Sequence, residues 1–206
     1  MPLTVVDHPV ARHLLTRLRN QETEPYDFRA LAEQLAGVLA LEASRSLPTQ
    51  DITVRTPLEE TSGERIAVGI SAVAVLRAGL GMLDAIARMF PDVTVGTIGL
   101  ARDEQTAEPR GYYSKLPDLH SRVTMLLDPM LATGGTACYA LRLLRDSGAE
   151  RMQMLCAVAA PEGVERVLRD FPEVEIFTAA LDRGLDEKRF IRPGLGDFGD
   201  RLFGTT

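Results

Sequence analysis

The chain has 206 residues, which is enough for one domain or for one domain with a small extension. A hydrophobic content of 45% and a charged content of 25% are ordinary for a soluble globular protein, and no apolar run approaches the ~20 residues that span a bilayer. The formal net charge of −6 argues against a protein that binds nucleic acid through bulk electrostatics, although a few local donors can still hold a small anion.

The apolar spacing predicts two helices at the start of the chain. Residues 9–20 form the first, with Asp7 as a candidate cap. Residues 26–46 form the second, with Asp27 as a candidate cap and Pro48 ending it. We expect this helical start to pack on the flank of the remaining chain or in a subunit contact.

The middle of the chain alternates strands and helices. The predicted strands are residues 52–56, 66–76, 93–100, 123–127, 152–159 and 174–181, the helices are residues 82–90, 137–147 and 161–170, and a polar turn covers residues 57–63. Such alternation predicts a parallel sheet with helices on both faces. Ligands of these sheets lie at the carboxyl ends of the strands, so we expect the loops after Leu76, Leu100 and Leu127 to meet at one edge.

Two segments depart from this alternation. Residues 102–115 are long and charged and lack apolar periodicity, which favours a functional flap or hairpin over a passive link. Residues 182–206 are rich in glycine and have little periodicity, so we expect a shaped loop region rather than a core element. The chain thus reads as one domain with helices over residues 9–47, a core over 52–181 and a C-terminal region over 182–206.

Residues 123–136 form the most informative stretch. An apolar run ends at Asp128, and a short loop rich in Thr and Gly precedes a helical pattern. A helix N-terminus carries partial positive charge and unpaired N–H groups, and Gly134 and Gly135 let an anion approach the backbone. The stretch therefore indicates phosphate binding, with an ordinary turn whose threonines cap the helix as the alternative. Its spacing is neither that of a Walker loop nor that of a dinucleotide fingerprint.

Charged side chains follow several strands. Arg77 and Arg102 stand at strand ends, where a guanidinium group suits a pyrophosphate, although a surface Arg paired with an acid fits equally well. Asp128 accepts hydrogen bonds from sugar hydroxyls, faces a cation, or caps its own loop. Asp197 is either a ligand acid or part of an Asx turn, and its spacing alone favours the turn.

Several short motifs occur in order along nearly the whole chain. They are His8-Pro9, Leu76-Arg77-Ala78-Gly79-Leu80-Gly81-Met82, Arg102-Asp103-Glu104-Gln105-Thr106 with Glu108-Pro109, Asp128-Pro129-Met130-Leu131-Ala132-Thr133-Gly134-Gly135, Ala159-Ala160-Pro161-Glu162-Gly163, Pro193-Gly194-Leu195-Gly196-Asp197, Gly199-Asp200 and Phe203-Gly204-Thr205. Together they resemble the uracil phosphoribosyltransferase family. The loop after Asp128 resembles the phosphoribosyl pyrophosphate (PRPP) loop of all type I phosphoribosyltransferases, and Pro129 in place of a second acid resembles the uracil branch.

The resemblance implies an α/β fold of the type I phosphoribosyltransferase kind. A mostly parallel central sheet is then flanked by helices, and the Gly-rich C-terminal region forms a hood over the base. The implied reaction transfers the phosphoribosyl group of PRPP to N1 of uracil with Mg²⁺, giving UMP and pyrophosphate in pyrimidine salvage.

The resemblance also implies roles for single residues. The residues that match the PRPP loop are Asp128, Pro129, Met130, Leu131, Ala132, Thr133, Gly134, Gly135 and Thr136. Arg77 and Arg102 match positions that hold the pyrophosphate, and Asp197 matches a further PRPP contact; with Asp128 these are the expected catalytic residues. The backbone of Ile191, Gly196, Asp197 and Phe198 matches the uracil site. No protein ligand set for a metal is expected, because Mg²⁺ is held mainly through PRPP.

Three residues depart from the family pattern beside the base site. Arg192 stands where an aliphatic residue is expected, Phe198 where a small one is usual, and Phe190 where Tyr is common. The ring of Phe198 narrows the pocket if it turns inward, whereas the change is tolerated if only its backbone touches the base. The resemblance further implies a strained or cis peptide between Arg77 and Ala78, and closure of the 102–115 flap over the site.

Partners and competing functions follow from the same observations. Cys138 and Cys156 lie in apolar contexts, which favours buried reduced thiols in a cytoplasmic protein over a disulfide or a metal site. The resemblance suggests a homo-oligomer, at least a dimer, with GTP as an activator of some members. The alternatives are a transferase for another base, an RNA-binding regulator that senses PRPP, and a catalytically silent homologue. We expect neither a nucleic-acid nor a membrane partner.

Overall fold

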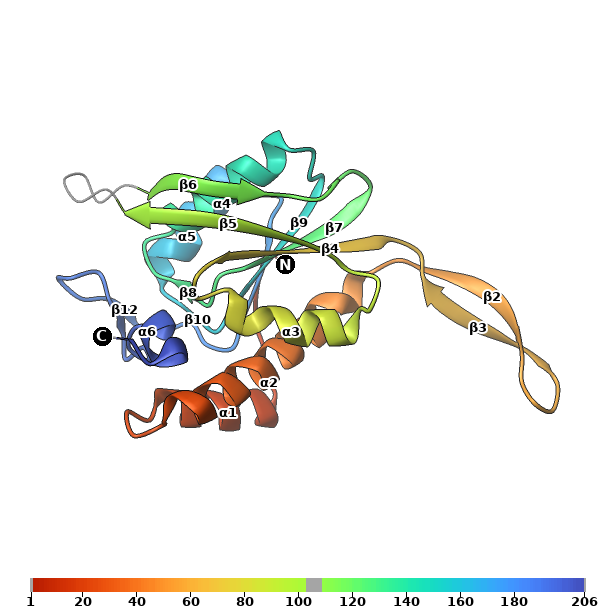
Figure 1. Cartoon of the computed structure of the whole chain (residues 1–206), viewed down its shortest axis with the longest axis horizontal. Coiled ribbons are helices and arrows are strands. Elements are labelled where there is room, and N and C mark those ends of the chain that lie inside the picture. The colour runs from red at the N-terminus through yellow and green to blue at the C-terminus, as the bar shows by residue number, and fades with distance from the viewer. Residues whose placement is uncertain (1, 103–108, 206) are drawn as a thin grey trace.

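A seven-stranded sheet forms the centre of the computed structural model, which describes residues 2–102 and 109–205 (Figure 1). The strands lie in the order β1-β11-β9-β7-β4-β5-β6, and every neighbouring pair is parallel except β5 and β6. Their bounds are β1 (Leu3–Val5), β4 (Gly69–Leu76), β5 (Thr94–Arg102), β6 (Pro109–Lys115), β7 (Arg122–Leu127), β9 (Arg151–Cys156) and β11 (Glu175–Thr178). The predicted α/β class with a mostly parallel sheet is confirmed.

Helices cover both faces of this sheet. One face carries α1 (Pro9–Arg19), α2 (Pro25–Ala43) and α3 (Leu80–Met89), and the other carries α4 (Gly135–Asp146) and α5 (Pro161–Asp170). In β7, Met125 and Leu127 belong to the hydrophobic cluster formed with α1, α2 and α3, whereas Leu126 belongs to the cluster formed with α4 and α5. Because successive side chains point to opposite faces and both faces are covered, the strand reads as a nearly continuous apolar run, which Thr124 interrupts. Within the described ranges, none of the helices is long and apolar enough to cross a membrane.

The two N-terminal helices lie where they were expected, but their caps differ. His8 caps α1, because its Nδ1 accepts a hydrogen bond from the backbone N–H of Val10 at 3.1 Å, whereas Asp7 pairs with Arg12. The N-cap of α2 is Glu24, without a side-chain capping bond, and a 3₁₀ turn η1 (Ser44–Ser46) follows this helix. The predictions of Asp7 and Asp27 as caps were therefore wrong. A proline in the first turn, with its preset φ, begins each helix.

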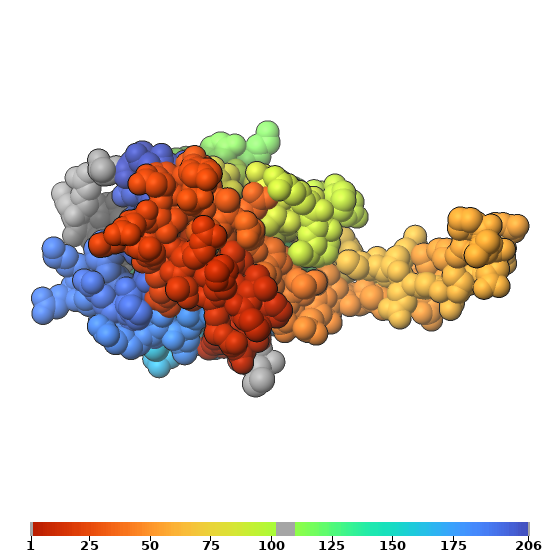
Figure 2. Space-filling view, turned by 90° about the horizontal axis from the view of Figure 1, so that it is seen from below, coloured from red at the N-terminus to blue at the C-terminus, as the bar shows by residue number. Residues whose placement is uncertain are grey.

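A β-hairpin extends from the body as an arm (Figure 1; Figure 2). It pairs β2 (Thr49–Arg55) with β3 (Glu60–Ile66) in antiparallel register. The expected turn over residues 57–63 was thus too long, since β3 begins at Glu60. Most residues of both strands are exposed, so the second strand has no alternation of apolar and polar residues to reveal it.

Short elements surround the carboxyl edge of the sheet. They are β8 (Met130–Leu131), β10 (Val158–Ala159), β12 (Gly184–Leu185), β13 (Ile191–Arg192) and α6 (Phe198–Phe203). β8 pairs with β10, and β12 pairs with β13. The C-terminal region is therefore not merely a loop, because a hairpin and a helix form there and Phe198 and Leu202 enter the core. The expected flap includes β6, and residues 103–108 lie outside the described part.

Candidate active site

A cleft of about 460 Å³ lies at the carboxyl edge of the sheet. It is lined by Val75, Leu76, Arg77, Ala78, Leu100, Ala101, Asp128, Met130, Ala132, Thr136 and residues 188–191 and 196–200. The carboxyl ends of β4 and β5 and the segments that follow β4 and β7 thus meet the C-terminal region at one edge, as the strand pattern predicted. The topology brings together the predicted loop, Arg77 and the C-terminal glycines.

The loop after β7 packs against α5. Gly134 has a φ of +76°, and a Cβ at this position would lie 2.9 Å from the carbonyl oxygen of Gly163. Gly134 is also the N-cap of α4, so this helix begins without a side-chain capping bond. The threonine-capping alternative is thereby weakened, since the threonine contact that the structure describes there is long: Thr133 Oγ1 accepts from Gly135 N–H at 3.5 Å. The N-terminus of α4 faces a small hollow of about 20 Å³ lined by Asp128 and residues 130–137.

Asp128 stands at the end of β7 and is only 9% exposed. Its backbone N–H donates to the carbonyl oxygen of Leu155 at 3.3 Å, which ties the loop to the next strand. Its side chain lines both the cleft and the loop hollow. Because a buried carboxylate is costly without a partner, Asp128 is suited to accept hydrogen bonds from a sugar hydroxyl or from local donors, or to face a cation.

Arg77 contacts the last residues of the chain. Its Nη2 lies 3.5 Å from Asp200 Oδ1 and 3.4 Å from Thr205 Oγ1, and its guanidinium carbon lies 5.3 Å from the ring centre of Phe203. The side chain is 57% exposed, so the cation is accessible at the rim of the cleft. The cis peptide bond precedes this residue, between Leu76 and Arg77, so the expectation at Arg77–Ala78 was wrong by one bond.

The other predicted charged residues differ in what the structure describes. Arg102 is the last residue of β5, at the same sheet edge as Arg77, and its side chain lies outside the described atoms. Asp197 lines the cleft and also caps α6, because its Oδ1 accepts a hydrogen bond from Asp200 N–H at 2.9 Å. The turn alternative for Asp197 is therefore seen, and its place in the cleft wall is compatible with a ligand role as well.

The predicted base site shows how the family departures are accommodated. Phe198 is 2% exposed and its ring packs against Phe28 in the core. Arg192 is held by Asp186, with Nε 2.7 Å and Nη2 2.5 Å from Oδ2, and does not line the cleft. Phe190 lines the cleft and is 49% exposed. Neither Arg192 nor the ring of Phe198 therefore narrows the site.

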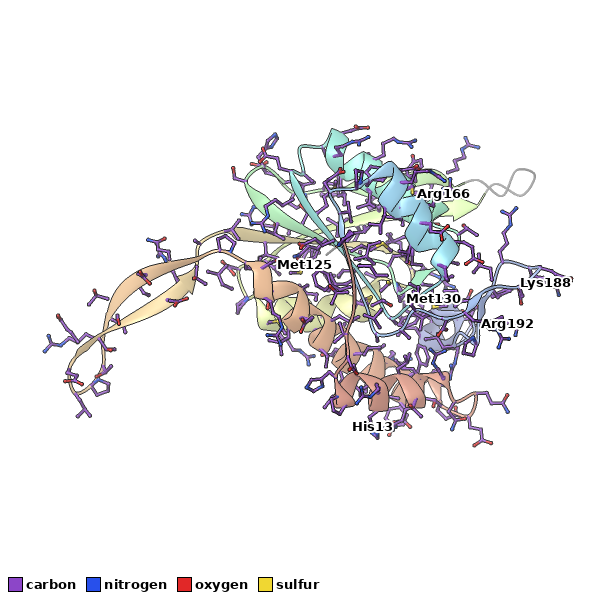
Figure 3. All side chains as sticks on the ribbon, turned by 180° about the vertical axis from the view of Figure 1, so that it is seen from behind. His13, Met125, Met130, Arg166, Lys188 and Arg192 are labelled. Carbon is purple, nitrogen blue, oxygen red and sulfur yellow. The ribbon has the colours of Figure 1, made fainter. Side chains whose placement is uncertain are left out.

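Sequence reasoning missed part of the cleft wall. Lys188 and Arg189 line it from the β12–β13 hairpin, and Lys188 lies near the tip of this loop (Figure 3). Asp200 also lines the cleft and pairs with Arg77. The Gly199-Asp200 motif could have indicated Asp200, whereas the aperiodic hairpin carries no signal for the two cations.

The family model described as "Uracil phosphoribosyltransferase" matches residues 5–205. The chain belongs to the uracil phosphoribosyltransferase family. This family transfers the phosphoribosyl group of PRPP to uracil and forms UMP, which makes its members glycosyltransferases. The match covers almost the whole chain and includes every segment of the cleft.

Relatives and solved structures agree with this assignment. The uracil phosphoribosyltransferase of Halalkalibacterium halodurans is 48% identical over 98% of this chain and 97% of the relative, and that of Thermus thermophilus is 46% identical over the full length of both chains. The structure of the AQ2163 protein from Aquifex aeolicus has a TM-score of 0.94 at 36% identity and 99% coverage of both chains. A hypoxanthine-guanine phosphoribosyltransferase from Bacillus anthracis shares the fold, with a TM-score of 0.52, 12% identity and coverage of 77% of this chain and 80% of that chain.

Proposed function

We propose that this chain transfers the 5-phosphoribosyl group of PRPP to N1 of uracil, giving UMP and pyrophosphate for pyrimidine salvage. The observation that carries the proposal is the cleft in which the loop at Asp128, Arg77 and residues 196–200 meet. A phosphate site, a cation and a wall of backbone groups are what a substrate with a phosphate, a pyrophosphate and a planar base requires.

The proposed PRPP site consists of the loop over residues 128–136 and the cations at its rim. The N-terminus of α4 binds the 5-phosphate, because helix N-terminal N–H groups and the helix dipole favour an anion there. Arg77 and Arg102 bind the pyrophosphate, with the guanidinium fork matching its oxygens. Asp128 accepts hydrogen bonds from the ribose hydroxyls, and Asp197 contacts PRPP from the opposite wall.

The proposed cofactor is Mg²⁺ bound through PRPP. Phosphoribosyltransferases generally use this ion with PRPP, and Mg²⁺ usually keeps several waters and binds through substrate phosphates. In the described part of the chain, no group of three or more His, Cys, Asp or Glu side chains is arranged to hold a metal. The buried carboxylate of Asp128 fits a single protein contact to an ion held by PRPP. When bound, the ion supplies positive charge to the leaving pyrophosphate.

Uracil is recognised by the backbone of Ile191, Gly196, Asp197 and Phe198. One N–H donating to uracil O4 and one carbonyl accepting from N3–H select uracil, since cytosine presents the opposite pattern. A base that leaves such buried groups unpaired is rejected strongly. The ring of Phe198 in the core is consistent with a contact through its backbone alone.

The proposed reaction is a substitution at C1 of the ribose. The bond from C1 to the pyrophosphate oxygen breaks, and pyrophosphate leaves with the electron pair while Arg77 and Arg102 stabilise its charge. The sugar passes through an oxocarbenium-like state, and N1 of uracil attacks the opposite face and releases its proton to solvent water. Positioning and electrostatic stabilisation supply most of the catalysis.

Turnover with four bases tests the proposal. PRPP and Mg²⁺ are incubated with uracil, cytosine, hypoxanthine or orotate, and nucleotide and pyrophosphate are followed together. Formation of a nucleotide with uracil alone supports the proposal, whereas pyrophosphate release with another base overturns the proposed specificity for uracil. PRPP binding without product from any base would instead favour a regulator.

We further propose that the protein works as a homo-oligomer in the cytoplasm. An isolated two-stranded hairpin is marginally stable in water, yet the β2–β3 arm extends from the body with Leu58 95% exposed and Val54 39% exposed. A second copy that covers the arm explains this exposure. Light scattering tests the assembly, and adding GTP to the turnover assay tests the activation implied by the family.

The cytoplasmic location is supported by the cysteines. Cys138 and Cys156 are free and buried, which fits a reducing compartment.

A further inference from the structure

A buried ion pair joins the end of α1 to the C-terminal region. Arg19 Nη1 and Nη2 donate to the two carboxylate oxygens of Asp182 at 2.9 and 2.6 Å. The Asp182 side chain is 5% exposed and that of Arg19 is 24% exposed. The geometry is the forked pairing that combines strength with fixed orientation.

The same pair holds one residue of the C-terminal loop from both sides. Arg19 Nη1 also donates to the carbonyl oxygen of Gly194 at 2.8 Å, and Gly194 N–H donates to Asp182 Oδ2 at 2.9 Å. Gly194 has a φ of +61°, and a Cβ there would lie 2.2 Å from the carbonyl oxygen of Ile191. The loop is therefore bent sharply at this residue, and both of its peptide polar groups are held by the pair.

Arg201 holds the next residue of this loop. Its Nη1 donates to the carbonyl oxygen of Leu195 at 2.7 Å and also to that of Leu18, and its Nη2 donates to that of Asn20 at 2.5 Å. Its guanidinium carbon lies 4.5 Å from the ring centre of Phe28. These contacts attach the loop to the C-terminal end of α1, beside which α6 lies in Figure 1.

Gly194 and Leu195 lie between the two parts of the proposed base wall. Ile191 precedes them and residues 196–198 follow, and all of these line the cleft. If the base is read by backbone groups, its recognition depends on where this backbone stands, and small misplacements are costly. We propose that Arg19 and Asp182, supported by Arg201, are positioning residues that set the backbone of residues 191–198 for base recognition. The inference rests on the proposed function for the identity of the base.

Kinetics of Arg19→Gln, Arg19→Lys and Asp182→Asn test this role. Removing one partner leaves the other charge buried, so Arg19→Gln has the largest effect. We expect its KM for uracil to rise at least about 10-fold and its discrimination between uracil and cytosine to fall. The KM for PRPP should rise less, because Asp197 is the only one of the proposed PRPP contacts that lies within residues 191–198. Lysine retains the charge but cannot fork to Asp182 and reach Gly194 together, so Arg19→Lys is intermediate.

Hydrogen exchange gives a second measurement that needs no turnover. Peptides covering residues 191–198 exchange faster in Arg19→Gln than in the wild type, whereas peptides from β4, β7 and α4 keep the wild-type rate. Arg17→Gln is the matched control, because Arg17 is exposed on the same helix turn, and it leaves kinetics and exchange unchanged.

The outcomes separate the inference from the proposed function. An unchanged KM for uracil with unchanged exchange in Arg19→Gln overturns the inference. Parallel rises in both KM values with faster exchange across the sheet also overturn it, because the pair would then support the fold alone. If the wild type does not use uracil but Arg19→Gln still loosens residues 191–198, the proposed function fails and the positioning role stands.

Discussion

Phe28 of α2 and Phe198 of α6 pack edge to face, with ring centres 5.0 Å apart and an interplanar angle of 72°. Both rings are almost fully buried. This contact packs the C-terminal region against the N-terminal helices. It also places the ring of Phe198 in the core, at a position where the family usually has a small residue. Only the backbone of Phe198 then needs to face a base.

Truncating Phe198 tests the weight of this contact. We expect Phe198→Ala to lower the free energy of unfolding by about 3–5 kcal/mol, because it removes a buried ring and leaves a cavity. Urea denaturation measures the change. The half-exposed Phe190 provides the control, since Phe190→Ala should cost less than about 1 kcal/mol. Equal effects of the two substitutions would show that the ring of Phe198 is not a core residue.

A side chain at Gly134 should damage the phosphate site. Alanine in the left-handed region costs about 1–2 kcal/mol, and its Cβ would meet the backbone of Gly163. We expect Gly134→Ala to weaken PRPP binding at least about 10-fold by calorimetry. Gly37→Ala is the control: Gly37 lies in α2, and beyond its own stretch of helix backbone nothing lies within 4 Å of the new Cβ, so PRPP binding persists and stability rises slightly. Wild-type PRPP affinity in Gly134→Ala would count against the loop as the phosphate site.

Replacing Arg77 by lysine keeps the charge and removes the fork. If the guanidinium stabilises the leaving pyrophosphate, kcat/KM for PRPP falls by about 10²–10³-fold, as for other preorganised donors to a developing charge. Steady-state kinetics measure the loss. Arg88 on α3 pairs with Glu33 and supplies the control, so Arg88→Lys should be nearly silent. A drop below three-fold in Arg77→Lys would remove this residue from the proposed mechanism.

The β12–β13 hairpin should respond to acid. The N–H of Phe190 and then the guanidinium of Arg192 hold the pKa of Asp186 below its ordinary 3.8. The folded pKa is thus below the unfolded one, so the stabilising contribution is complete above pH ~4 and is lost as the pH falls through the folded pKa. An NMR titration of the Phe190 amide should have a midpoint below 3.8 that rises in Arg192→Gln and is unchanged in Arg183→Gln. An unchanged midpoint in Arg192→Gln would show that the Asp186–Arg192 pair does not lower the pKa of Asp186.

The two cysteines should be unreactive in the folded protein. Desolvation raises the pKa of Cys156 to about 12 and also raises that of Cys138. Since the thiolate is the nucleophile and both residues are buried, we expect no labelling by a thiol reagent at pH 8. Both thiols should react once the chain is unfolded in guanidinium chloride. Fast labelling of the native protein would indicate opening of the α4–α5 face.

Much of the site could be predicted from the sequence because its signals are local. The apolar run that ends at Asp128, the glycines that follow and the helical spacing after them lie within one short stretch. Because parallel strands end at one edge of a sheet, the alternation of strands and helices was sufficient to place this loop and Arg77 at the same edge. The cap of α1 was misassigned because Asp7 and His8 are adjacent and each can accept a backbone N–H, and only the folded chain shows that His8 does so. The cap of α2 was misassigned because its N-cap is Glu24, which makes no side-chain capping bond.

The α/β alternation, the loop after Asp128 and the family could be determined from the sequence alone, since each depends on residue type and short spacing. Three relationships needed the folded chain: Arg19 meets Asp182 across 163 residues, Phe198 turns toward Phe28, and residues 49–66 form an exposed arm. They could not be predicted because pairing and rotamer choice depend on which surfaces meet when the chain folds. Periodicity reports only whether a residue is buried, and not against what.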